Sequence, residues 1–140
     1  MRYLDTSLLV AAFTNEVATA RVQAWLGEQS QDGLSISEWV VTEFSSALSI
    51  KMRCGQIAAS DRAEALASFT RLAERSLNVI PISATHFRTA ARFADQYVLG
   101  LRAGDALHLA IAEERGATLC TLDRRLAEAG LALGVNTVIA

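Results

Sequence analysis

Short apolar runs alternate with helical patterns along this 140-residue chain, and no hairpin signal joins two of the runs. Runs of strand length lie at 1–4, 34–36, 79–82, 117–122 and 135–139. Helical patterns lie between them, at 7–13, 17–29, 37–54, 62–75, 83–97, 105–115 and 124–129. Strands that alternate with helices in this way form parallel sheets covered by helices. The sequence therefore predicts a three-layer α/β/α fold with a mostly parallel central sheet.

Polar residues mark where several of these elements begin. Asp32-Gly33 is a turn signal before the second strand. Ser37 is a predicted N-cap, and Asp61 with Glu64 three residues later resembles a capping box. Pro81 lacks a backbone N–H, so its run is expected to be an edge or irregular strand.

The composition is that of a compact globule, with 51% hydrophobic and 20% charged residues. We expect one domain over residues 1–140, burying about two-thirds of its extended surface.

The longest clean apolar run, Leu8 to Phe13, is too short to span a membrane. Cys54 and Cys120 form no C-x-x-C pair, which favours reduced thiols and a cytoplasmic location. A net charge of −2 argues against a general nucleic-acid coat protein but not against a nuclease.

Four acidic residues lie in apolar segments where carboxylates are uncommon: Asp5, Glu43, Asp105 and Asp123. Asp5 and Asp123 each follow an apolar strand directly and precede a helix. Ligands of open α/β sheets bind outside the carboxyl ends of the strands, so we expect both acids on that rim. They lie near each other if their strands are neighbours. The alternative is that each only caps its helix, a common role for Asp.

Glu43 and Asp105 belong to helical segments. Glu43 lies within or beside the apolar stripe of its helix, where Glu is rare unless it is paired or binds a ligand. A structural salt bridge to an arginine is the alternative. Asp105 opens a segment that is apolar nearly all round, with His108 on the same face. His108 can orient Asp105 or contact a substrate phosphate, although a hydrogen-bonded core histidine is the commoner finding.

Converging carboxylates need compensation. A pair about 4 Å apart repels by about 4 kcal/mol at an effective dielectric of 20. Several such pairs would remove a sizeable part of a domain's stability of about 5–15 kcal/mol. Protonation, arginines or a divalent cation can offset the repulsion. An oxygen-only ligand set selects a hard ion such as Mg²⁺ or Mn²⁺, which can activate water for an attack on phosphorus.

Segments 4–7, 37–48, 103–110 and 119–123 together resemble the PIN-domain ribonucleases, and most closely the VapC-type toxins of toxin–antitoxin pairs. The likeness covers essentially the whole chain, and Asp-Ala-Leu-His-Leu-Ala at 105–110 is its most specific part. It implies a PIN-like fold and an endoribonuclease that depends on Mg²⁺ or Mn²⁺. Such an enzyme hydrolyses RNA phosphodiester bonds with metal-activated water.

The resemblance also implies a role for each acid. Asp5 and Asp105 would be the main metal ligands, Glu43 would ligate directly or through water, and Asp123 would complete the catalytic set. Hydroxyl groups would hold these acids or their waters, namely those of Thr6 or Ser7 and of Thr121. The chain departs from many relatives at Leu122 and Leu126, which leaves the role of Asp123 the least supported.

The resemblance further implies an RNA substrate, a cognate antitoxin protein that blocks the site, and a homodimer. A housekeeping RNA-processing nuclease and a catalytically silent binding or scaffold module are the alternatives.

Two other α/β classes are excluded by single positions. A haloacid-dehalogenase-type phosphatase needs an Asp where Ser7 stands, and a response-regulator receiver needs a late lysine, whereas Lys51 is the last one in this chain.

Overall fold

The computed structural model describes residues 1–30 and 33–140. The turn predicted at Asp32-Gly33 includes Asp32 and so lies outside the described residues. Five parallel strands form one sheet in the order β3-β2-β1-β4-β5, which confirms the predicted parallel sheet. The strands are β1 (Arg2–Leu4), β2 (Leu34–Ser37), β3 (Asn78–Ile80), β4 (Thr118–Thr121) and β5 (Thr137–Ile139).

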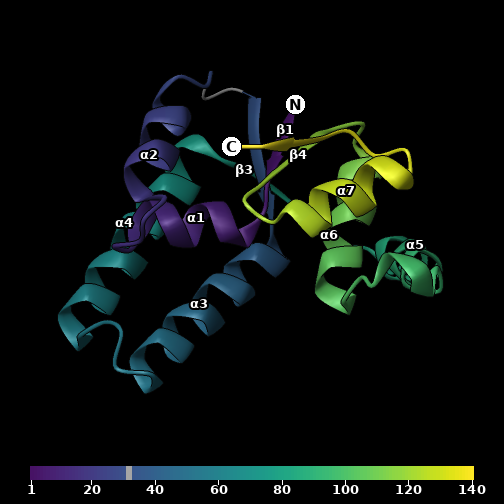
Figure 1. Cartoon of the computed structure of the whole chain (residues 1–140). Coiled ribbons are helices and arrows are strands. Elements are labelled where there is room, and N and C mark those ends of the chain that lie inside the picture. Colours follow the sequence, from purple (N-terminus) through teal and green to yellow (C-terminus); the bar gives the residue numbers. More distant parts are fainter. Residues whose placement is uncertain (31–32) are drawn as a thin grey trace.

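Helices cover both faces of this sheet and complete the predicted α/β/α layers. Figure 1 shows α1 to α4 gathered on one side of the strands and α5 to α7 on the other. Their bounds are α1 (Thr6–Phe13), α2 (Thr19–Gly27), α3 (Glu38–Arg53), α4 (Ala59–Ser76), α5 (Ala84–Ala94), α6 (Ala103–Glu114) and α7 (Arg124–Ala132). A short 3₁₀ helix, η2 (Tyr97–Leu99), lies between α5 and α6.

Two predicted caps differ in detail from the structure. Helix α4 begins at Ala59, earlier than predicted, because Asp61 is its third residue and not its N-cap. The Asp61 carboxylate accepts a hydrogen bond from the backbone N–H of Ala58 at 2.8 Å. This is one of the two hydrogen bonds that make up a capping box, the one from the third helical residue to the N-cap backbone. Ser37 does occupy the N-cap position of α3, but its side chain makes no cap hydrogen bond because its Oγ pairs with the Tyr3 hydroxyl at 2.7 Å.

Other element ends shift by a few residues. Helix α6 begins at Ala103, so Asp105 lies in its first turn and does not cap it. Helix α5 ends at Ala94, short of the predicted 97, and the chain continues into η2. The run with Pro81 forms an edge strand, β3, that ends one residue before the proline, as predicted.

The core lies between the sheet and its helices. Helix α6 is buried from Ala106 to Ala112, as its all-round apolar sequence predicts. On the other side of the sheet, Phe13, Phe44 and Phe69 pack together with ring centroids 4.3 to 6.3 Å apart. None of the helices in residues 1–30 and 33–140 combines the length and apolar character that a membrane crossing requires.

Candidate functional site at the carboxyl edge of the sheet

Asp5 directly follows the central strand β1 and is the most enclosed acid of the predicted set. Only 4% of its surface is exposed. Ser7 Oγ and Thr121 Oγ1 each donate a hydrogen bond to its carboxylate at 2.7 Å, and Leu8 donates its backbone N–H at 3.3 Å. Asp5 is therefore the N-cap of α1, as the capping interpretation held. Burial raises the pKa of Asp5 although His108 and these hydrogen bonds lower it, so its charge is poorly compensated.

The hydroxyls around Asp5 also join β1 to β4. Ser7 Oγ accepts the backbone N–H of Leu122 at 3.0 Å, and Thr121 Oγ1 accepts that of Asp123 at 2.9 Å. These bonds form because β1 and β4 are neighbours in the sheet. The carboxyl ends of the two strands, and the acids that follow them, therefore share one edge.

Asp123 caps helix α7 at that edge. Its Oδ1 accepts the backbone N–H groups of Arg125 at 2.8 Å and Leu126 at 3.2 Å. Its side chain is exposed, in contrast to that of Asp5. The capping interpretation thus holds for Asp123 as well, and an exposed carboxylate at a helix N-terminus needs no further compensation.

Glu43 lies on α3, half-buried, and its partners are Thr6 and His108 and not an arginine, which was the structural alternative. Its Oε2 accepts a hydrogen bond from Thr6 Oγ1 at 2.5 Å and lies 2.6 Å from Nε2 of His108. Burial by itself raises the pKa of Glu43. The hydrogen bond and charge of His108, with the Thr6 hydroxyl, outweigh burial and lower that pKa. Glu43 is therefore held as a carboxylate.

His108 connects Glu43 to the interior of the sheet. Its Nδ1 lies 2.9 Å from the Tyr3 hydroxyl, which lies 2.7 Å from Ser37 Oγ. Every group in this chain has a partner: Nε2–H of His108 donates to Glu43, and the Tyr3 hydroxyl bonds both Nδ1 and Ser37 Oγ. His108 is thus the hydrogen-bonded core histidine that was the commoner expectation. Within the described residues its bonded partners are Tyr3 and Glu43 and not Asp105.

Asp105 is half-buried in the first turn of α6. Burial raises its pKa, and the nearby charges of Asp123 and Glu43 raise it further, whereas His108 and the backbone N–H of Arg102 lower it. Glu43 and Asp123 are therefore close enough to Asp105 for their charges to act on it, and His108 acts on Asp5, Glu43 and Asp105 alike. Within residues 1–30 and 33–140, however, no three acidic, histidine or cysteine side chains form a ready-made metal cage.

Two residues that the sequence reasoning did not use also shape the position of Glu43. A Cβ atom on Gly104 would lie 2.9 Å from Glu43 Oε1 and 3.3 Å from Trp39 Nε1, so only glycine leaves the carboxylate in place. The Trp39 indole N–H contributes to lowering the pKa of Glu43. It makes no well-formed hydrogen bond in the described part of the chain. The glycine before Asp105 was the sequence signal for this close approach.

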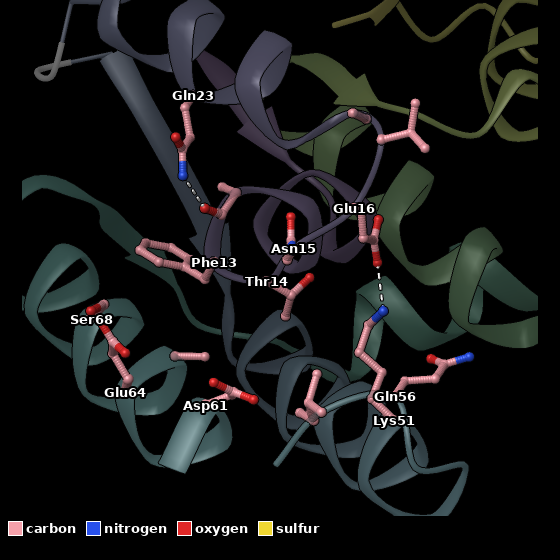
Figure 2. Close-up of a pocket in the computed structure, with 15 residues that line it drawn as sticks. Phe13, Thr14, Asn15, Glu16, Gln23, Lys51, Gln56, Asp61, Glu64 and Ser68 are labelled. Atoms are coloured by element: carbon pink, nitrogen blue, oxygen red, sulfur yellow. Dashed lines mark hydrogen bonds and ion pairs between the residues drawn. The ribbon is translucent and has the colours of Figure 1, made fainter. Parts of the chain in front are cut away.

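A large cleft lies elsewhere on the molecule. It is a cleft of about 1060 Å³ between the α1–α2 connection and the facing ends of α3 and α4 (Figure 2). Lys51 and Glu16 form an ion pair across it at 2.7 Å. None of the four acids lines this cleft, so it is separate from the candidate site.

Several carboxylates thus lie along the carboxyl edge of a parallel α/β sheet. The sequence model of the PIN domain family matches residues 2–131. The chain therefore belongs to the PIN domain family, as the resemblance indicated.

Solved structures agree with this assignment in fold. VapC20 of Mycobacterium tuberculosis, described as a sarcin-ricin loop cleaving toxin, has a TM-score of 0.75 at 18% identity, covering 93% of this chain and 95% of its own. FitAcB of Neisseria gonorrhoeae has a TM-score of 0.71 at 17% identity, covering 98% and 96%. PAE2754 of Pyrobaculum aerophilum has a TM-score of 0.70 at 24% identity, covering 99% and 84%. No protein of curated function matches this chain in sequence.

Proposed function

We propose that this PIN-domain protein is an endoribonuclease that depends on Mg²⁺ or Mn²⁺, and that it is the toxin of a toxin–antitoxin pair. The buried Asp5 carboxylate carries the proposal. It is buried at the carboxyl end of the central strand, and His108 acts on Asp5, Glu43 and Asp105 alike, which supports one shared site. The structural likeness to VapC20, a toxin that cleaves the sarcin-ricin loop, supports RNA as the substrate class.

The donor set fits a hard cation. The four acids offer oxygen donors, and burial raises the pKa of both Asp5 and Asp105, so a positive charge there would lower the free energy of the ionised site. Mg²⁺ characteristically takes one or two carboxylates and completes its shell with water and phosphate oxygens. Asp5 and Asp105 would supply those two ligands, and the site then needs no cage of three side chains. When bound, the ion would supply an activated water and charge stabilisation at phosphorus.

The residues around the ligands have separate tasks in this proposal. Ser7 and Thr121 fix both oxygens of Asp5 and so orient its carboxylate. Glu43 is kept ionised, with Oε2 occupied by Thr6 and His108, so Oε1 is the atom available to accept a proton from water or to hold a coordinating water. Asp123 adds negative charge at the rim while it caps α7.

The partners follow from the structural neighbours. A toxin–antitoxin complex from Klebsiella pneumoniae shares this fold at a TM-score of 0.60 and 21% identity, and VapBC2 of Rickettsia felis, bound to promoter DNA, shares it at 0.70 and 16%. By this likeness we propose a cognate antitoxin for this chain, and homodimerisation as in the family resemblance. Expression with and without a neighbouring small gene tests the first proposal, because an antitoxin should relieve growth arrest.

Cleavage of a structured RNA by purified protein tests the enzymatic proposal. We expect cleavage with Mn²⁺ or Mg²⁺, none with EDTA, and a loss of at least about 100-fold in Glu43→Gln, the range that a positioned acid–base group contributes. Glu64→Gln is the matched control, because Glu64 is exposed on α4 and lines the separate cleft. Cleavage that survives EDTA, or equal rates for the two variants, would contradict the assignment.

A further inference from the structure

Three arginines border the acidic edge, and their side chains take no part in the contacts described so far. Arg102 directly precedes α6, whose first turn carries Asp105. Arg124 and Arg125 open α7 directly after Asp123. All three are exposed, and none forms an ion pair within the residues that the structure describes.

An exposed aromatic residue lies in η2, and other η2 residues line a small hollow together with Arg125. In η2, Tyr97 is 86% and Val98 82% exposed. Gly100 follows η2 with a φ of 63°, a left-handed conformation that favours glycine. Two residues later the chain reaches Arg102, the N-cap of α6. A hollow of about 340 Å³ separates η2 from α7, and its lining includes Val98, Leu99, Gly100, Arg125, Glu128 and Ala129.

We propose that Tyr97, Arg102, Arg124 and Arg125, hereafter the arginine rim, bind the single-stranded RNA segment next to the scissile phosphate. This inference rests on the proposed ribonuclease function. An exposed tyrosine offers a face on which one base can stack, and stacking of this kind tolerates any base sequence. Arginine guanidinium groups match phosphate oxygens in a bidentate geometry.

The hollow adds a chance to discriminate among bases. Arg125 offers donors and Glu128 offers an acceptor on the same wall, a pair that can meet the polar edge of an unstacked base. Single-stranded loops expose such edges, whereas the deep major groove of an RNA duplex hides them. The rim therefore favours loops over helical stems.

A second copy of the chain fits this surface less well than RNA does. A two-fold symmetric interface places the same patch on both subunits, so the arginines of one copy would face those of the other. Their like charges would repel. A polyanion faces no such conflict, and the metal proposed at Asp5 and Asp105 would offset the acids behind the rim.

RNA binding by the Asp105→Asn protein in EDTA tests the rim apart from catalysis. The probe is a short fluorescein-labelled single-stranded RNA, measured by anisotropy at several salt concentrations. We expect Tyr97→Ala to raise Kd about tenfold and Tyr97→Phe to retain binding, since phenylalanine keeps the stacking face. Arg125→Ala should reduce the slope of log Kd against log salt by about 0.7, the value for one lost phosphate contact to a single strand. Arg62→Ala, an exposed arginine on α4, is the matched control and should change neither quantity.

The outcomes separate the rim from the function. Unchanged Kd and salt slope in Tyr97→Ala and Arg125→Ala, in a protein whose parent cleaves RNA, would overturn the rim and leave the ribonuclease intact. A shift from dimer to monomer in Tyr97→Ala, seen by light scattering, with RNA affinity retained, would assign this surface to self-association and also overturn the rim. Rim-dependent binding by a parent protein that never cleaves RNA would support the rim and contradict the proposed function.

Discussion

Removing the Tyr3 hydroxyl should destabilise the protein more than an ordinary surface change of the same kind. Tyr3 is fully buried, and its hydroxyl bridges Ser37 Oγ and His108 Nδ1 at 2.7 and 2.9 Å. Tyr3→Phe deletes one oxygen and leaves two buried polar atoms without that partner. An unsatisfied buried group costs about 1–3 kcal/mol. Because the Ser37 hydroxyl can rotate towards another acceptor, we expect a loss of about 2–4 kcal/mol in the free energy of unfolding.

Urea unfolding followed by circular dichroism measures this loss, with Tyr97→Phe as the matched control. Tyr97 is 86% exposed, so its hydroxyl is satisfied by water and its removal should change stability by less than about 0.5 kcal/mol. Tyr3→Phe should also slow RNA cleavage in the folded protein, because His108 then loses the bond that fixes its ring towards Glu43. Equal stability of the two variants would refute the buried hydrogen-bond chain.

Three further results are expected. Gly104→Ala should slow cleavage, because its Cβ would displace Glu43 Oε1, whereas Gly27→Ala, which has open space around its Cβ, should leave the rate unchanged in the same assay. Asp5→Asn should raise the free energy of unfolding at neutral pH in the absence of metal. The pKa of Asp5 is raised in the folded state, so its ionisation opposes folding at pH values above that raised pKa. The gain in stability over the wild-type protein should therefore shrink as the pH falls below the raised pKa. Mn²⁺ should raise the Tm of the wild-type protein and not that of Asp5→Asn, whereas an equal rise in both proteins would count against a role for Asp5 in metal binding.

The fold was largely predictable because local patterns determine it. Alternating strand and helix lengths without hairpin turns leave few arrangements other than a parallel sheet. The edge position of β3 followed from Pro81 alone. Helix starts were less predictable, since Asp61 and Asp105 lie inside their first turns and not at their caps. An acidic residue is favourable at either place, so its presence does not fix the boundary.

The four candidate acids could be singled out from the sequence, but their contacts could not. That Asp5 and Asp123 follow neighbouring strands depends on β1 and β4 being paired, and strand order is set by the whole fold. An arginine was the alternative partner considered for Glu43, yet its partner is His108, which is 65 residues away in the chain. Tyr3 gave no signal, because a tyrosine in a buried strand is ordinary until its hydroxyl finds a partner 105 residues away.

Calorimetric titration of Mn²⁺ into the purified protein tests the central claim most directly, namely that Asp5 and Asp105 at the carboxyl edge of the sheet hold a divalent cation. We expect binding by the wild-type protein and by Glu64→Gln, and a loss of that binding in Asp105→Asn, with its folded structure retained by circular dichroism. Equal Mn²⁺ binding by wild type and Asp105→Asn, or none by wild type, would contradict the proposed metal site.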